Sequence, residues 1–459
     1  MRQFGAILKD SFREAVDGFV IYLMLGLSAV VVLIVGSLSF TPAPPPEAFA
    51  KIVPGFSAVF PEKGRSRVFT GSADQYRATD VQPAGGGYAL RLGVAAQPNA
   101  GPLPGDNGDS FRQAVAAWAK PAEKAGEVEV GGKGKGGRKV DFGVQSASVE
   151  EQRAVTDARM ADFIESQFAV QAGMDATVTR VTTNVAEPEY AFDVTTTGGS
   201  SVKGWPHTTK IFFGATTLND ETPLGGVLWL IEDVIVSRFG GTLVLLVGMI
   251  ITSFFIPNML RKGSVDLLIS KPIGRTQLLV YKYVGGLTFV FLLSAFTVGG
   301  IWLALAVRSG YWNPDFLWAI PILTFTFAVL YAMSTLVAVV TRSAVAAMLL
   351  TVGFAFFLFV VGQIKSGYDD VRAERPDAER SAWVGPVIDT THDVLPRTRE
   401  LDVLTRRLIS EGTLTPATQR LAVQAAGPPA PLLATFGVSL AHIALMLAAA
   451  CWWFGRRDN

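Results

Sequence analysis

Long apolar runs alternate with polar stretches along this chain, and their lengths predict which segments cross a membrane. Two runs, Phe239 to Leu260 and Val284 to Val307, carry no formal charge. Each exceeds the ~20 residues that an α-helix needs to cross the hydrocarbon core of a bilayer. Four further runs have similar lengths: Gly18 to Phe40, Phe316 to Val340, Ala344 to Ile364 and Leu432 to Phe454. Together the six runs predict six transmembrane helices.

The residues before the first apolar run predict a helix that lies in the membrane interface. Apolar residues recur there at helical spacing, and charged residues fall elsewhere on the helical wheel; the apolar positions are Phe4, Ile7, Leu8, Phe12 and Ala15. A signal peptide is the competing interpretation, but the apolar run is long and no clear Ala-x-Ala cleavage site follows it. We therefore expect residues 1–40 to form an interfacial helix and an uncleaved first span.

Residues 41–225 hold no spanning run and predict an inserted α+β domain outside the cytoplasm. At about 185 residues, the stretch is long enough to fold independently. It opens with the Pro-rich run 42–46, which predicts a stiff, extended linker. Val128, Val130, Val140, Phe142 and Val144 alternate on either side of a Gly/Lys-rich loop, which predicts a β-hairpin.

A helix and further strands are predicted in the second half of this domain. Ser148 and Glu151 resemble a capping box that opens a helix reaching about Val170. Its inward positions are predicted to be Val155, Met160, Phe163, Ile164 and Phe168. Alternation predicts one strand through Tyr190, Phe192 and Val194 and another from Lys210 to Gly214.

The remaining segments are assigned by their apolar content and by the parity of the spans. Residues 226–364 contain an interfacial helix, Leu228 to Arg238, in which Glu232 and Asp233 are expected to face solvent, followed by the second to fifth spans. Residues 365–431 form a second polar stretch on the outer side, with a surface helix over Leu401 to Ser410. Residues 432–459 form the sixth span and a tail.

Composition agrees with a membrane protein and excludes several other classes. Hydrophobic residues make up 49% of the chain and charged residues only 17%, which is too apolar for a soluble protein of this length. The net charge is +1, so nothing in the overall charge points to nucleic acid. The single cysteine, Cys451, excludes a disulfide within the chain.

Local positive charge marks one loop as cytoplasmic. The segment 261–283 lies between the second and third predicted spans and sets several basic residues against the single carboxylate Asp266; they are Arg261, Lys262, Lys271, Arg275 and Lys282. Lys/Arg excess in a short loop indicates the cytoplasmic side. The apolar face and the Pro-Gly corner in this segment suit a short helix that receives force from a soluble partner. An ordinary basic loop that anchors two helices is the alternative.

The segment resembles the cytoplasmic hairpin of ABC-2-type transporter permeases, and in particular the branch that includes permeases for the maturation of copper enzymes. The pattern falls on Gly263, Asp266, Leu267, Leu268, Ser270, Pro272, Arg275 and Lys282. Ser264 and Val265 stand where the family often has Thr and Leu. The resemblance implies an all-α polytopic membrane domain of the type-2 ABC exporter kind, with both termini cytoplasmic, and it does not extend to the inserted domain.

From this resemblance we expect the chain to be the permease subunit of an ATP-driven exporter in a bacterial inner membrane. A separate ATPase, which would carry ATP and magnesium, is expected to dock on the hairpin. Two copies of the permease, identical or paralogous, are expected in the complex, and the outer domain is expected to bind a substrate or an envelope partner. The residues assigned to docking are Gly263, Asp266, Leu267, Leu268, Ile269, Ser270, Lys271, Pro272, Arg275 and Lys282.

No catalytic motif competes with this interpretation. The Gly/Lys-rich stretch 131–139 lacks the Gly-Lys-Ser/Thr of a phosphate-binding loop, so we predict no ATPase and no cofactor in this chain. The three histidines show no metal-ligand spacing. An intramembrane hydrolase pairing Ser294 or Ser334 with His442 is one alternative, and a membrane-anchored sensor or scaffold acting through the outer domain is another.

Polar residues inside the spans are candidates for lining a transport pathway. Helix-to-helix hydrogen bonding is the simpler explanation for them, and packing is the simpler explanation for His442. The candidates are Thr252, Ser253, Asn258, Ser294, Thr297, Ser334 and His442.

Overall fold

The computed structural model describes residues 19–57, 60–62, 65–67, 75–95, 110–118, 155–184, 189–236, 274–374, 383–426 and 431–456. The predicted interfacial helix at the N-terminus, the hairpin around residues 128–144, the span Phe239 to Leu260 and the segment 261–273 lie outside these residues.

Four of the described helices are long and apolar enough to cross a membrane. They are α10 (Arg275–Ser309), η5 with α11 (Pro314–Trp318 and Ala319–Thr341), α12 (Ala344–Glu374) and α16 (Leu432–Arg456). They coincide with the third to sixth predicted spans, although α12 continues ten residues beyond the predicted end at Ile364. The apolar helix α2 (Phe19–Gly36) lies within the first predicted span.

Two tyrosine side chains and a glycine hold α10 close against α11. The hydroxyl of Tyr283 donates to the carbonyl of Ala328 at 2.8 Å, and the rings of Tyr283 and Tyr331 stack with centroids 5.0 Å apart. A Cβ on Gly286 would lie only 2.7 Å from the ring of Tyr331. That ring also stacks on Phe327 at 5.3 Å, so it has no room to move aside.

A separate sheet region forms from residues 45–197. Its sheet is antiparallel, with strand order β4-β5-β7-β6, and the strands are β4 (Tyr76–Ala84), β5 (Gly87–Ala95), β6 (Ala176–Asn184) and β7 (Glu189–Thr197). The other elements are α3 (Pro45–Ile52), η1 (Val53–Ser57), β2 (Phe60–Glu62), β3 (Arg65–Arg67), α4 (Ser110–Trp118), α6 (Asp157–Gln167) and η3 (Phe168–Ala172).

The core of this region confirms the predicted inward positions. All five residues predicted for the inner face of the helix are buried, as are the three alternating residues of β7. Helix α6 begins after Thr156, whose hydroxyl accepts from the Arg159 amide at 3.4 Å. The predicted cap formed by Ser148 and Glu151 lies outside the described residues.

The Pro-rich run 42–46, predicted as an extended linker, is extended only as far as Pro44. Residues 39–42 form strand β1 (Ser39–Pro42), and Pro45 begins helix α3. Proline is favoured in the first turn of a helix because its fixed φ suits the helix and the missing N–H is not needed there. Helix α3 buries Phe49, which packs edge-on against Trp205 with ring centroids 5.6 Å apart.

A small second sheet connects this region to the helices. Its strand order is β1-β8-β9, with β8 at Pro206–Ile211 and β9 at Thr216–Pro223, and α7 (Leu224–Asp233) follows at once. The strand predicted over Lys210 to Gly214 corresponds to β8, which begins and ends earlier in the chain. It ends at Ile211 because Phe212 and Phe213 have positive φ angles and form a turn. The chain leaves the helical layer through β1 and returns to it through β9.

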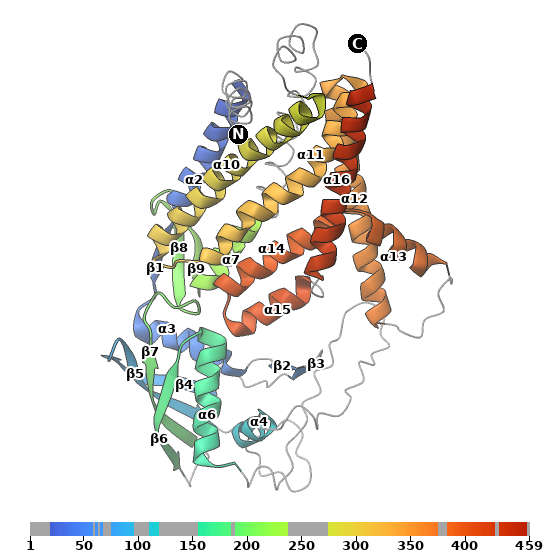
Figure 1. Ribbon diagram of the computed structural model, residues 1–459. Helices are drawn as coiled ribbons and strands as arrows, with labels where there is room; N and C mark the ends of the chain where they lie inside the picture. The colour runs from blue at the N-terminus through green and yellow to red at the C-terminus, as the bar shows by residue number, and fades with distance from the viewer. Residues whose placement is uncertain are drawn as a thin grey trace.

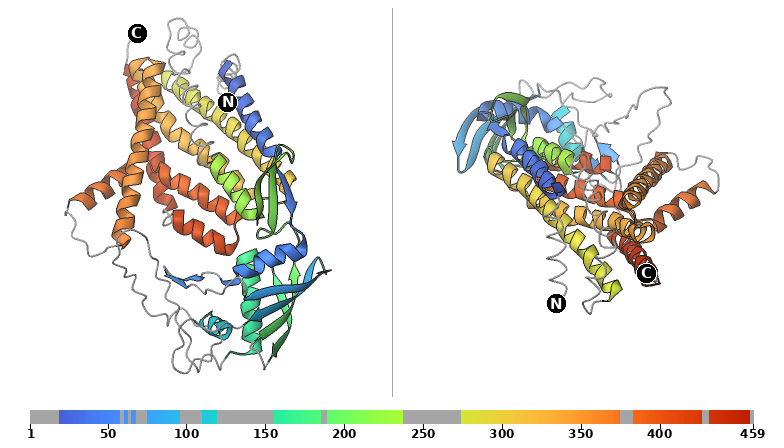
Figure 2. Two further views of the ribbon diagram at one scale, coloured as in Figure 1. Left: turned by 180° about the vertical axis from the view of Figure 1, so that it is seen from behind. Right: turned by 90° about the horizontal axis from the view of Figure 1, so that it is seen from above.

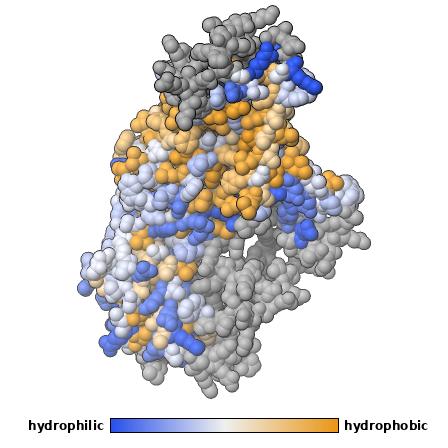
Figure 3. Space-filling model, viewed as in Figure 1, coloured by the Kyte–Doolittle hydropathy of each residue, from blue (hydrophilic) through white to orange (hydrophobic). Residues whose placement is uncertain are grey.

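Three helices of the second polar stretch complete the fold: α13 (Val384–Val394), α14 (Thr398–Thr413) and α15 (Pro416–Ala426). The helix predicted over Leu401 to Ser410 is found within α14, which buries one face through Leu401, Thr405 and Ile409 and leaves the side chains between them partly exposed. In Figure 1, α14 and α15 lie between the long helices and the four-stranded sheet, and the view from behind agrees (Figure 2). A hydrophobic band covers the long helices, with polar surface on the side of the sheets (Figure 3).

We predict that Gly286→Ala lowers the free energy of unfolding by about 1–3 kcal/mol, the usual cost of overpacking a filled core. Thermal unfolding of the purified protein in detergent would measure the change. The matched control is Gly299→Ala on the same helix, because a Cβ at Gly299 meets nothing within 4 Å. Equal unfolding temperatures for the two variants would contradict the close packing of α10 on α11.

Candidate functional site: the junction between the helices and the sheets

Backbone contacts define a junction where the start of α7, the loop 203–205 and the end of α14 meet. The amides of Leu224 and Gly225 donate to the carbonyls of Trp205 and Lys203 at 2.9 and 2.8 Å. These bonds satisfy the first N–H groups of α7, which have no partner within their own helix. A Cβ at Gly225 would lie 2.1 Å from the Thr413 carbonyl oxygen, so glycine is required for this approach.

The last carbonyls of α14 accept side-chain donors from two other parts of the chain. The Lys203 Nζ donates to the Glu411 carbonyl at 3.1 Å, and the Tyr311 hydroxyl donates to the Gly412 carbonyl at 2.6 Å. The C-terminal end of a helix carries partial negative charge, which favours a cation such as Lys203. Lys203 belongs to the sheet side and Tyr311 to the turn after α10, so α14 connects the two.

A buried carboxyl group lies at the centre of the junction. The Glu232 side chain is 2% exposed, and its Oε2 accepts from the Asn313 Nδ2 at 3.0 Å. Burial raises the pKa of Glu232 to about 8, although the Asn313 hydrogen bond opposes this effect and the charge of Asp315 adds to it. At neutral pH the group is therefore mostly protonated and uncharged.

The next residue, Asp233, forms an ion pair that joins α7 to α14. Asp233, also buried, lies 3.6 Å from the Nη1 of Arg406 on α14. The expectation that Glu232 and Asp233 form a solvated face is therefore wrong. Sequence alone gave no signal of their burial, because their partners Asn313 and Arg406 are 81 and 173 residues away along the chain.

The opposite end of α14 is fixed to the long helices. The guanidinium of Arg399 donates to the Ser366 Oγ at 2.6 Å and to the carbonyl of Gly362, both on α12. The Arg397 amide donates to the Ser439 Oγ on α16 at 3.3 Å. Helix α14 thus contacts α12 and α16 at one end and the sheet-side loop at the other.

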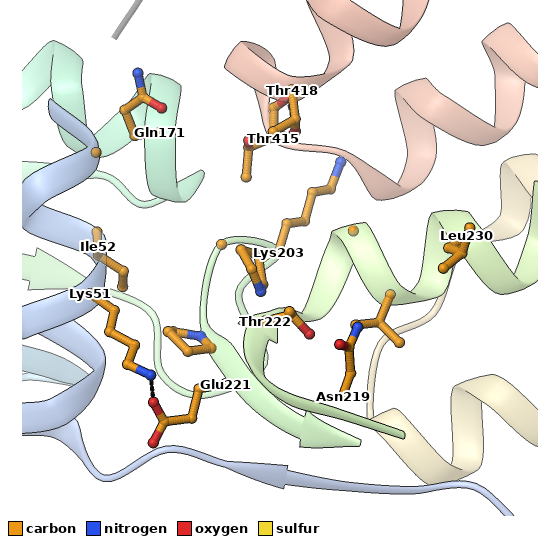
Figure 4. A pocket seen from close by; sticks show the side chains of 16 residues that line it. Lys51, Ile52, Gln171, Lys203, Asn219, Glu221, Thr222, Leu230, Thr415 and Thr418 are labelled. Atoms are coloured by element: carbon orange, nitrogen blue, oxygen red, sulfur yellow. Dashed lines mark hydrogen bonds and ion pairs between the residues drawn. The ribbon is translucent and has the colours of Figure 1, made fainter. Parts of the chain in front are cut away.

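A cavity of about 460 Å³ opens beside the junction. Figure 4 shows that its walls come from α3, η3, the loop, β9, α7 and the start of α15, with an ion pair between Lys51 and Glu221 at one edge. Burial lowers the pKa of Lys203 in this wall, and the charge of Asp315 offsets part of the effect. The lining mixes apolar residues with hydroxyl, amide and charged groups; the main members are Lys51, Ile52, Gln171, Lys203, Thr222, Val227, Leu230, Thr415 and Thr418.

Only two of the residues assigned to ATPase docking lie in the described part of the chain. Arg275 is the first residue of α10, and Leu278 and Leu279 behind it are buried in a cluster with Val337, Ala347 and Ala450. The cluster ties this end of α10 to α11, α12 and α16. Lys282 is buried within the helical layer at 2% exposure. The other docking residues lie outside the described ranges; they are Gly263, Asp266, Leu267, Leu268, Ile269, Ser270, Lys271 and Pro272.

The pathway candidates are distributed over several helices. Thr252, Ser253 and Asn258 lie outside the described residues, and Ser334 is buried on α11. The Thr297 hydroxyl donates to the Ser28 hydroxyl on α2 at 2.8 Å, which is a hydrogen bond between two helices. It also lies 2.9 Å from the Leu293 carbonyl on its own helix.

Of the three hydrolase candidates, Ser294 and His442 show no paired arrangement. His442 stacks on Phe354 with centroids 5.4 Å apart. Among the described residues, neither the His442 Nε2 nor the Ser294 Oγ has a hydrogen-bond partner. The hydrolase alternative therefore gains no support from this geometry, whereas stacking on Phe354 agrees with a packing role for His442.

Comparison with known families identifies the class of the protein. A sequence model of the ABC-2 family transporter proteins matches residues 142–459, which cover the long helices, the junction and the segment 261–283. The chain belongs to this family. Its members are typically non-enzymatic membrane subunits of ABC transporters, which act with a partner ATPase. No curated protein matches the chain.

The raised pKa of Glu232 predicts that the protein becomes less stable as pH rises. In the folded state the carboxyl stays protonated up to about pH 8, whereas in the unfolded state it ionises near pH 4.3. The stabilisation is therefore complete below the unfolded pKa and is lost as pH rises towards 8. We expect Glu232→Gln, which keeps an acceptor for Asn313, to flatten the decline in unfolding temperature between pH 5 and pH 8. Parallel pH profiles for the two proteins would contradict a neutral buried Glu232.

Proposed function

We propose that the chain is the permease subunit of an ATP-driven exporter and that it is moved by a separate ATPase docked on the segment 261–283. The observation that carries the proposal is the family match, which spans both this segment and the long apolar helices. The basic residues of the segment and its Pro-Gly corner favour a cytoplasmic hairpin. ATP and magnesium would bind the partner, and this chain would hold no cofactor.

The packing of α10 supports a mechanical role for this segment. Helix α10 begins at Arg275, within the segment, and its first turns pack with α11, α12 and α16. At its other end, the turn that follows α10 donates from Tyr311 to α14. A displacement of the hairpin would therefore tilt α10 and move the junction, which would couple the ATPase to the sheet region.

The finer arrangement is part of the same proposal. Six spans place both termini in the cytoplasm and the sheet region outside a bacterial inner membrane, and two copies of the permease form the complex. Exposed tryptophans at the sheet-side ends of the helices, Trp312 and Trp318, support a membrane boundary at that level. Trp452 and Trp453 are exposed at the opposite end of α16, which supports a second boundary there.

We expect Leu267→Asp with Leu268→Asp to reduce co-purification of the partner ATPase at least tenfold, because two carboxylates would enter the apolar groove proposed to hold these leucines. Affinity purification of the tagged permease, with quantitation of the bound ATPase, measures the effect. The matched control is Thr276→Asp with Gln277→Asp, which adds the same charge at two exposed positions at the start of α10. Unchanged co-purification of the leucine variant would refute this docking site.

The proposed topology predicts opposite labelling of two engineered cysteines. In a Cys451→Ala background, which removes the only native cysteine, we expect Asp220→Cys on β9 to react with a membrane-impermeant maleimide in spheroplasts. Ser264→Cys in the hairpin should react only after the membrane is permeabilised. Labelling of Ser264→Cys in intact spheroplasts would overturn the proposed function, because an ATPase could not reach the segment.

A further inference from the structure

Two adjacent phenylalanines project from the tip of the β8–β9 hairpin. Phe212 is 61% exposed and Phe213 is 78% exposed. Both have positive φ angles, 53° and 56°, and Gly214 follows at 101°. A left-handed backbone is unfavourable for a residue that carries a side chain. This turn therefore combines local strain with two large apolar side chains that contact little of the described protein.

Hydrogen bonds to the end of α2 hold the strained turn in place. The Phe213 amide donates to the Ser37 carbonyl at 2.8 Å, and the Phe212 amide donates to the Ser37 hydroxyl at 3.2 Å. The same hydroxyl donates to the Ile34 carbonyl within α2 at 2.7 Å. Ser37 thus fixes the hairpin tip at the sheet-side end of α2, and the hairpin lies beside this end in Figures 1 and 2.

Neighbouring residues indicate that this level is the edge of the hydrophobic band. Arg308, at the end of α10, donates from its Nε to the Leu38 carbonyl at 2.5 Å. Trp312, in the turn that follows, is exposed and packs edge-on against Trp302 with centroids 5.3 Å apart. Tryptophan and arginine at the ends of apolar helices are typical of the membrane–water interface. The tip therefore lies where apolar helices give way to polar surface.

We propose that Phe212 and Phe213 insert into the bilayer at the boundary between headgroups and acyl chains and anchor the sheet region to the membrane surface. The inference rests on α2 crossing the membrane, as in the proposed topology. Lipid is the occupant that the position favours, because the tip is bound to the end of an apolar helix at the level of the exposed tryptophan. Burial of two aromatic side chains in lipid would offset the strain of the turn.

Spin labelling of the reconstituted protein tests this anchor. In a Cys451→Ala background, Ala215→Cys places a nitroxide beside the tip and leaves both phenylalanines intact, and Glu189→Cys places one on an exposed position of β7 in the outer sheet. In lipid nanodiscs, we expect the label at residue 215 to collide more with oxygen than with a water-soluble nickel complex, and the label at residue 189 to show the reverse. Adding Phe212→Ser and Phe213→Ser should bring the label at residue 215 to the aqueous pattern.

Three outcomes would overturn the proposal. Access of the nickel complex to residue 215 with both phenylalanines present would place the tip in water. Low access of both reagents would indicate a protein contact, and dipolar broadening that disappears on dilution with unlabelled protein would identify a second copy of the chain. ATPase co-purification of the serine variant separates these results from failure of the proposed function. The tip is bound to Ser37, close to the Arg308 end of α10, whereas the docking residue Arg275 lies at the other end of that helix.

Discussion

The fold depends on satisfying the backbone at the end of α14 away from water. A helix leaves its last carbonyls without partners of their own, and here they lie between two layers of the protein. Lys203 and Tyr311 donate to two of these carbonyls, and Gly225 allows the start of α7 to approach a third. Because each donor comes from a different layer, the sheet region and the helices have one defined position relative to each other.

The long helices also depend on close approach and hydrogen bonds, but here small residues and hydroxyl groups make the contacts instead of charged groups. Within an apolar solvent, helices associate through close packing and hydrogen bonds rather than through the hydrophobic effect. Gly286 lets the ring of Tyr331 lie against α10, and Thr297 bonds to Ser28 of α2. A rigid contact of this kind moves as a unit, which suits helices that transmit a displacement from one end to the other.

The elements that could be predicted from sequence are those set by local pattern. Length and apolarity gave the third to sixth spans, and alternation gave Phe192 and its neighbours on β7. The errors arose where tertiary contacts decide the outcome. The pattern of α14 predicts a helix with one apolar face, but it does not show that this face packs against α7 and the turn after α10. Glu232 and Asp233 carry the same formal charge, and the sequence does not show that burial raises the pKa of Glu232 or that Asp233 pairs with Arg406. The branch of the family and the finer site assignments stay predictions.

Polar groups at the junction are better explained by specificity than by stability. Asp233 is buried and Arg406 is partly exposed. Their ion pair recovers little more than the desolvation cost of the carboxylate, so an apolar contact of similar volume could pack there with little loss of stability. Apolar side chains, however, would tolerate several relative positions of α7 and α14. The directed hydrogen bonds from Asn313, Tyr311 and Lys203 do not tolerate several positions, because each bond is lost when its partner moves by more than a fraction of an ångström. These bonds therefore hold α7 and α14 in one relative position, which suits the mechanical coupling that we propose.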